Sequence, residues 1–118
     1  MNDNQIEQEI LSKGLTAPRV TPKDIEDNIV QCHYFTADDG VHCVYQGGPE
    51  YQASDVNLKY LTFCVLVLKN GFTVTGESAC ASPENFNAEI GKQIARQNAV
   101  NKVWPLMGYE LKQRLSEE

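Results

Sequence analysis

The residues from Tyr60 to Cys80 constrain the fold of this chain more than any other part of the sequence. Residues 60–69 contain no strand breaker and are rich in β-branched and aromatic side chains. Asn70-Gly71 follows, and a second run of the same kind extends to Cys80. An Asn-Gly pair between two such runs predicts a β-hairpin with a two-residue type I′ turn.

That turn predicts a register in which Val67 lies opposite Val74. The first strand is apolar on both sides, because Leu66 and Leu68 alternate with a second apolar set, so we expect it to be central and covered twice. A single layer of helix cannot cover both faces. We therefore expect the N-terminal helices or a second subunit to cover the Leu66 face, and we favour a homo-oligomer. The second set, together with its predicted neighbours on the other strand, comprises Leu61, Phe63, Val65, Val67, Phe72 and Val74.

A long helix is predicted directly after the hairpin. Ser82 suits the N-cap, Pro83 suits the first helical position, and Glu84 places a negative charge near the positive end of the helix dipole. The helix is expected to run to Trp104, and Pro105 is expected to end or kink it. At helical spacing its apolar side consists of Phe86, Ile90, Ile94, Val100 and Trp104.

Further helices are predicted on either side of this unit. Residues 2–13 have the pattern of a short helix that Gly14 ends, and Thr21 with Pro22 and Asp24 is an N-cap signature for a helix to about Val30. Residues 106–115 have the pattern of a last helix. We expect residues 1–20 to form a helical arm and linker, and residues 21–118 to form one domain.

A second hairpin is predicted over residues 31–46, with its turn at Asp39-Gly40. In its register Tyr34 lies opposite Tyr45. The expected fold class is therefore α+β, with a small antiparallel sheet built from two β-hairpins and packed by the long helix and by shorter N- and C-terminal helices.

The charge distribution argues against several partners. The net charge is −6, and residues 1–82 carry eleven acidic against five basic side chains. Duplex DNA and anionic membranes both require a basic face, so we expect neither as a partner. The sequence shows no signal peptide and no apolar run that could span a bilayer, which favours a cytoplasmic protein with reduced thiols.

Few residues could carry chemistry. Cys32-His33 and His42-Cys43 could suggest zinc, but neighbouring strand residues point to opposite faces, so all four cannot converge. Two of them with a distant ligand remain an open alternative. The sequence has no nucleophile elbow and no phosphate-binding glycine loop. We expect no metal, no cofactor and no enzymatic activity.

The long helix offers the better candidates for binding. Ser82, Asn85 and the free amides at its start could hold an anion. Phe86 could stack on a base, or it could belong to the core. An amide row formed by Gln93, Gln97 and Asn101 must be satisfied by the backbone, a partner subunit, a polar ligand or water.

Three runs of the sequence closely resemble a family of small tailed-phage proteins. They are NGFTVTGESACASPENF at residues 70–86, EIGKQIARQNA at 89–99 and KVWPLMGY at 102–109, and YFTADDG at 34–40 resembles the same family. The family is the "gene forty-nine / gene sixty-six" domain family named from enterobacterial phages. The resemblance covers residues from about 21 to the end, and it implies a phage accessory protein acting in the host cytoplasm.

The hairpin followed by the SPENF segment also looks similar to phage counter-defence proteins that sequester nucleotide immune signals, the anti-Thoeris sponges. That resemblance implies that Phe86 stacks on a base and that Arg96 and Arg114 hold phosphates. The alternative is an acidic protein–protein interaction module that inhibits or redirects a host factor without a small ligand. Its acidic residues would be Asp24, Glu26, Asp27, Asp38, Asp39, Glu50 and Asp55.

Overall fold

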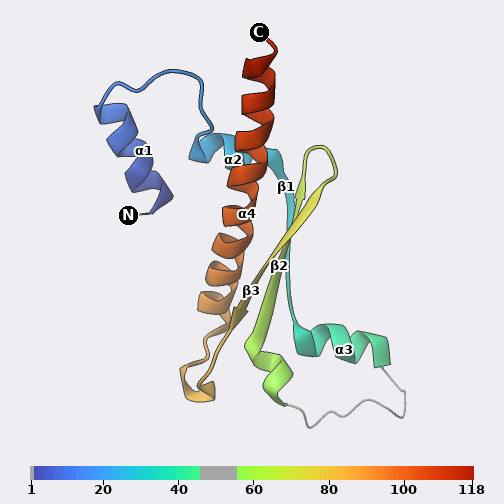
Figure 1. Ribbon diagram of the computed structural model, residues 1–118. Coiled ribbons are helices and arrows are strands. Elements are labelled where there is room, and N and C mark those ends of the chain that lie inside the picture. The colour runs from blue at the N-terminus through green and yellow to red at the C-terminus, as the bar shows by residue number, and fades with distance from the viewer. Residues whose placement is uncertain (1, 46–55) are drawn as a thin grey trace.

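A three-stranded antiparallel sheet, in the order β1-β2-β3, carries one long helix, α4, against one of its faces (Figure 1). The strands are β1 (Ile29–Thr36), β2 (Leu61–Leu68) and β3 (Thr73–Ala79), and α4 is Ala88–Ser116. The computed structural model describes residues 2–45 and 56–118. The expected α+β class, with an antiparallel sheet and a long helix after it, is confirmed.

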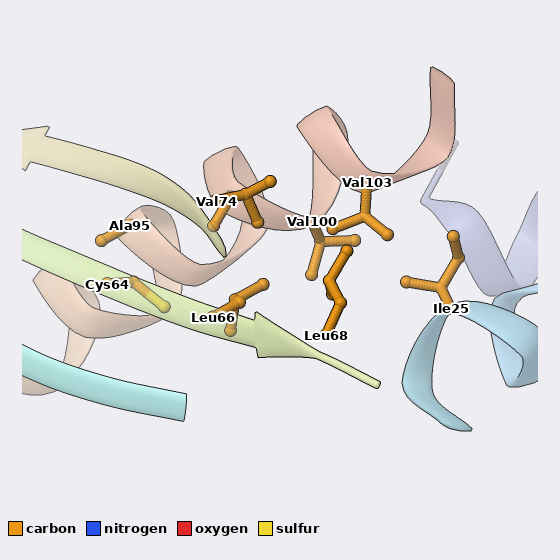
Figure 2. Packing of buried hydrophobic residues seen from close by; sticks show 9 residues of the cluster. Ile25, Cys64, Leu66, Leu68, Val74, Ala95, Val100 and Val103 are labelled. Atoms are coloured by element: carbon orange, nitrogen blue, oxygen red, sulfur yellow. The ribbon is translucent and has the colours of Figure 1, made fainter. Parts of the chain in front are cut away.

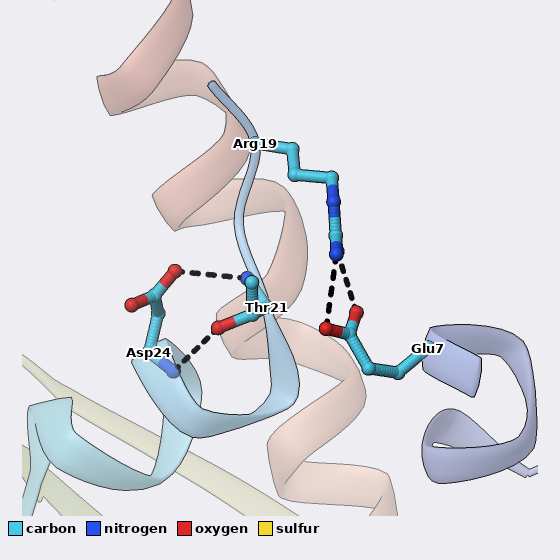
Figure 3. A network of polar contacts seen from close by, with 4 residues as sticks. All are labelled: Glu7, Arg19, Thr21 and Asp24. Carbon is cyan, nitrogen blue, oxygen red and sulfur yellow. Dashed lines mark hydrogen bonds and ion pairs between the residues drawn. The ribbon is translucent and has the colours of Figure 1, made fainter. Parts of the chain in front are cut away.

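Helix α2 starts where its capping signature predicts, and α1 lies within the predicted range of residues 2–13. Asn2 forms a capping box at the start of α1, and Thr21 forms one with Asp24 at the start of α2 (Figure 3). Gly14, just beyond the end of α1, has a φ of 67°. The remaining bounds are α1 (Asp3–Ser12), α2 (Pro22–Asn28), α3 (Ala37–Tyr45) and two short 3₁₀-helices, Val56–Tyr60 and Pro83–Asn85.

The predicted second hairpin is wrong, because the chain after β1 forms the helix α3. The backbone N–H of Thr36 donates to the Asp39 carboxylate at 2.8 Å, and the backbone N–H of Asp39 donates to the Thr36 hydroxyl at 3.1 Å. These reciprocal bonds form a capping box, so Asp39 starts a helix where Asp39-Gly40 appeared to be a turn. β1 pairs instead with β2, and Tyr34 lies opposite Cys64. Gln46, the end of the predicted hairpin, lies outside the described residues.

The first hairpin, β2 with β3, exists, but its register differs by one residue from the prediction. The backbone N–H of Leu68 donates to the Phe72 carbonyl at 2.9 Å, so the loop has three residues. Gly71 has a φ of 89° and Asn70 does not have a positive φ, which fits a three-residue loop better than a type I′ turn. Leu66 therefore lies opposite Val74. This shift reverses every side chain of β3 relative to β2 and brings Val74 to the Leu66 face.

The core lies between α4 and the alternate residues of β2 (Figure 2). Helix α4 covers most of the Leu66 face, which the prediction had assigned to the N-terminal helices or a second subunit. Of the N-terminal helices, α2 contributes one residue, Ile25, to the same core. The opposite face keeps Phe63, Val65 and Val67 only half-buried. The buried apolar residues are Ile25, Cys64, Leu66, Leu68, Val74, Ala95, Ala99, Val100 and Val103.

Helix α4 faces the sheet with small side chains rather than with the predicted isoleucines. Gly91, Ala95 and Ala99 are buried, whereas Ile90 is 54% exposed and Ile94 is 47% exposed. Small side chains allow the helix to lie close to the strands. The many contacts made by this close packing stabilise the core more than one large apolar side chain would. The predicted apolar side was right for Val100 and wrong for the two isoleucines.

The predicted ends of the long helix also need correction. Ser82 makes no side-chain capping bond, and Pro83 starts a 3₁₀-turn. Asn87 is the N-cap of α4, and its side chain accepts from the Ile90 backbone N–H at 3.0 Å. Pro105 lies within α4, which continues to Ser116, so residues 106–115 belong to the same helix. Proline has no backbone N–H, so the carbonyl of residue 101 loses its helical hydrogen bond. Residues 101 and 105 are both exposed, so this carbonyl can bond to water instead. Within the described ranges, no helix is both long and apolar enough to cross a membrane.

Candidate functional site

A hollow of about 200 Å³ lies where β2 and β3 meet the start of α4. The ring of Phe86 is half-buried, and its centroid is 5.3 Å from that of Tyr60 in an edge-on arrangement. Hydroxyl and amide groups surround these two aromatic rings. The lining residues are Tyr60, Thr62, Ser78, Ala79, Cys80, Asn85, Phe86, Asn87, Ile90, Gly91 and Ile94.

Gly91 keeps this hollow open. A Cβ atom at position 91 would lie 3.2 Å from the Thr62 hydroxyl oxygen and 4.0 Å from the Phe86 ring. Any side chain at this position would therefore enter the space between the two residues. The hollow offers a partly exposed aromatic ring together with short polar side chains, which suits a flat, polar group such as a nucleobase.

Of the two polar residues predicted at the helix start, Asn85 lines the hollow and Ser82 does not. Ser82 is exposed, and its backbone carbonyl accepts from the Cys80 thiol at 3.1 Å. The expected anion site at the start of a Pro83 helix does not form as drawn, because α4 begins at Ala88 and Asn87 caps it. Asn85 and Phe86 are the two predicted site residues that share this hollow.

Arg96 lies in a different hollow, of about 320 Å³, between α4, α2 and the start of α1. Its guanidinium donates two hydrogen bonds to the Glu26 carboxylate, at 3.0 and 2.8 Å. The hydrogen bond with Glu26 raises the pKa of Arg96 further above its ordinary value. A ligand phosphate would have to displace Glu26, so this pair primarily joins the two helices.

Arg114 lies near the other end of α4, paired with Glu110 at 2.6 Å. It lines a groove of about 710 Å³ between α2, the tip of the β2–β3 hairpin and the C-terminal half of α4. Arg114 follows the first residue of α4 by 26 positions, which corresponds to about 39 Å along the helix axis. Phe86, Arg96 and Arg114 therefore line three separate hollows of one chain.

Tyr60, Thr62 and Ser78 were not among the predicted site residues. Thr62 lies opposite Ser78 in the observed register, whereas the predicted register placed Ser78 opposite Phe63. If the three-residue loop that ends at Gly71 had been predicted from the sequence, Ser78 would have been placed beside Thr62 on the helix-covered face. The correct loop length was therefore the signal that could have found them.

The amide row of α4 is partly satisfied within the chain. The Gln97 side-chain N–H donates to the Asn101 side-chain oxygen at 2.8 Å and lies 3.4 Å from the Asp3 carboxylate. The Trp104 indole N–H also donates to Asp3, at 3.3 Å. Side chains of the same chain thus satisfy part of the row and hold α1 against α4, which was not among the alternatives drawn from the sequence.

The paired cysteines and histidines do not form a cluster. Cys32 and His33 point to opposite faces of β1, and His42 and Cys43 belong to α3. Among residues 2–45 and 56–118, no three His, Cys, Asp or Glu side chains come together in a way that could hold a metal ion.

Comparison with known proteins identifies the family. The model of the phage protein (N4 Gp49/phage Sf6 gene 66) family matches residues 20–115. Searches of curated proteins and of solved structures found no match. The matched region contains the sheet and nearly all of α4, and it leaves α1 outside. The chain belongs to the phage protein (N4 Gp49/phage Sf6 gene 66) family.

Proposed function

We propose that this phage protein is a non-catalytic accessory protein that binds and sequesters a small nucleotide-derived immune signal in the host cytoplasm. The hollow at Phe86 is the observation that carries this proposal. It combines a half-buried aromatic ring with the hydroxyls of Thr62 and Ser78 and the amide of Asn85. Aromatic rings beside a few polar groups are the usual means of recognising a base.

The volume of this hollow limits what one chain can hold. At about 200 Å³ it is smaller than most small-molecule sites, which occupy roughly 300–1,000 Å³. It can accept a base-sized part of a ligand, and the phosphates would extend beyond it. The cations that neutralise them must then come from outside the hollow, because its lining residues include no Lys or Arg.

A second copy of the chain is our proposed source of those cations. In an antiparallel pair of α4 helices centred on Val100, position 112 of one copy lies opposite position 88 of the other, the first residue of α4. At 100° per residue, Ile90, Ile94 and Tyr109 share one solvent-facing arc of α4 of about 100°. Lys112 lies within that arc and Arg114 on the far side, so Lys112 is the better placed to reach the partner's hollow.

A thermal-shift screen against cyclic nucleotides and cyclic ADP-ribose isomers tests the proposal. A ligand at a hundredfold excess over its Kd should stabilise the protein by about 2.7 kcal/mol. Phe86→Ala should lose the shift, and the matched variant Phe72→Ala should keep it, because Phe72 is 56% exposed at the hairpin tip and lies outside the hollow. If no nucleotide shifts the wild-type protein, the sponge function is refuted.

A pair of charge variants tests the contribution of a second copy. Lys112→Ala should weaken ligand binding and Arg114→Ala should not, and light scattering should give a dimer mass for the liganded protein. Ligand binding by Arg96→Ala must be compared with that by Glu26→Gln. Both variants lose the Arg96–Glu26 ion pair, and that loss alone can lower the stability of the protein. Equal ligand binding by Lys112→Ala and the wild type would show that Lys112 of a second copy does not hold the ligand.

A protein partner is the second candidate, and the exposed sheet face favours it. Phe35, Phe63, Val65 and Val67 remain partly exposed on the side away from α4, and the first two rings are 5.4 Å apart. The acidic residues expected to bind a host factor are largely engaged within the chain. Glu26 pairs with Arg96, Asp27 pairs with Lys23, and Asp24 and Asp39 cap helices, while Asp38 also has an intramolecular partner.

Glu50 and Asp55, the remaining two of these acidic residues, lie outside the described residues. A pull-down distinguishes the two candidates. A host protein retained by the wild type and by Gln93→Lys, at an exposed position of α4, but lost with Val65→Lys would support a partner on the sheet face. Together with an absence of nucleotide binding, that result would make the protein-binding module the better proposal.

A further inference from the structure

The sulfur atoms of Cys32 and Cys64 lie 3.7 Å apart between β1 and β2. Cys64 is opposite Tyr34 and Cys32 is opposite Leu66, so the two cysteines are diagonal neighbours on the face beneath α4. Both are free thiols. A disulfide requires the sulfurs to approach to about 2.05 Å, which a small movement of the edge strand can supply.

The two thiols have different surroundings. Cys64 is fully buried, and burial raises the pKa of its thiol to about 12. Cys32 is half-buried, and the Cys64 sulfur, 3.7 Å away, is its hydrogen-bonding neighbour. The attacking thiol in disulfide exchange must be reached by the other disulfide, and the fully buried Cys64 sulfur is less accessible than that of Cys32. Cys32 is therefore the attacking thiol of the pair, and Cys64 is the resolving one.

We propose that Cys32 and Cys64 form a reversible dithiol–disulfide site that reacts with low-molecular-weight disulfides such as oxidised glutathione. Neither thiol lines the Phe86 hollow, so this site is separate from the proposed ligand site.

The reaction proceeds in two exchange steps. The Cys32 thiolate attacks one sulfur of oxidised glutathione, which forms a mixed disulfide and releases one glutathione thiolate that takes up the proton lost by Cys32. Cys64 then loses its proton and attacks the Cys32 sulfur, which releases the second glutathione as a thiol. The two cysteines are oxidised by two electrons in total, and one glutathione disulfide is reduced to two thiols.

The product links the edge strand β1 to the central strand β2. Diagonal partners in an antiparallel pair have Cα atoms about 7–8 Å apart, which is wider than the roughly 4.4–6.8 Å of an unstrained disulfide. A strained disulfide is more easily reduced, and such bonds are the labile, regulatory kind. The geometry thus favours a bridge that forms and breaks with the thiol balance of the cell.

Peptide mapping of the folded wild-type protein tests the site. The protein is equilibrated with mixtures of reduced and oxidised glutathione, quenched with acid, alkylated and digested. The expected result is a linked peptide containing Cys32 and Cys64, lost again on adding dithiothreitol. The exposed Cys43 is the internal control, because its glutathionylation shows that the oxidant is active.

Two variants separate the roles of the thiols. Cys64→Ala should accumulate a glutathione mixed disulfide at Cys32, since nothing resolves it, and Cys32→Ser should leave Cys64 unmodified in the folded protein. If Cys43 is glutathionylated and the linked peptide forms only in urea, the proposal is overturned. The wild-type result decides this even if one of the variants fails to fold.

Discussion

Gly76 of β3 lies directly against the backbone of Ala99 of α4. A Cβ atom at position 76 would be 2.3 Å from the Ala99 nitrogen and 2.1 Å from the carbonyl oxygen of Ala95, one turn earlier. Both contacts are with backbone atoms, which cannot rotate away as a flexible side chain can. Glycine at 76 and alanines at 95 and 99 therefore set the distance between the sheet and the helix.

Gly76→Ala should destabilise the protein by about 3 kcal/mol or more, at the upper end of the range for overpacked cores, because α4 must move as a whole. Chemical denaturation measures this change. Thr75→Ala, on the opposite face of the same strand, is the control and should cost at most about 1 kcal/mol. Equal stability of Gly76→Ala and the wild type would mean that α4 does not contact β3 as closely as described.

Leu66→Ala and Val65→Ala test which face of β2 the helix covers. Leu66 is fully buried, so its truncation should cost about 2–5 kcal/mol. Val65 is half-buried on the open face, and its truncation should cost about 1 kcal/mol. Urea titrations of the two variants, with unchanged slopes, should give these two values. The reverse order would indicate that another surface covers the open face.

Asn87→Ala should cost about 1 kcal/mol, because the Asn87 side chain accepts a backbone hydrogen bond at the start of α4. Ser82→Ala should change the stability by less than about 0.5 kcal/mol, since Ser82 makes no side-chain capping bond. Thermal unfolding of the two variants measures the difference. A larger effect of Ser82→Ala would restore the helix start predicted from the sequence.

The attachment of α1 should weaken in acid. The hydrogen bond with Arg19, together with the charge of the same guanidinium, holds the pKa of the Glu7 carboxyl below its ordinary value of 4.5 (Figure 3). A carboxyl whose pKa is lowered in the folded state contributes stability above the unfolded pKa, and this contribution is lost as the pH falls through the lowered value. Hydrogen exchange of the α1 amides should therefore accelerate relative to α4 in that range.

Glu7→Gln should show the same loose α1 already at neutral pH. Glu9→Gln is the control, because the ion pair of Glu9 with Lys13 lies along α1 itself and is exposed. If α1 of Glu7→Gln remains as protected as in the wild type, the ion pair with Arg19 does not hold the arm.

The correct sequence predictions were those that depend on a few neighbouring residues. Thr21 and Gly14 marked helix ends because capping bonds join groups within four positions of each other. Asp39 shows the limit of such signals. Asp-Gly is as compatible with a hairpin turn as with the first turn of a helix, and the pairing of β1 with β2 decided between them.

The sequence by itself determined the α+β class, the existence of the β2–β3 hairpin and the long helix after it. Tertiary structure alone decided the hairpin register, the partner of β1 and the face of α4 that is buried. Register and helix face depend on how close two backbones can come, and Gly76 with Ala99 sets that distance. The candidate site followed the same rule. Asn85 and Phe86 share a hollow because the chain turns there, whereas Arg114 is separated from them by the length of a straight helix.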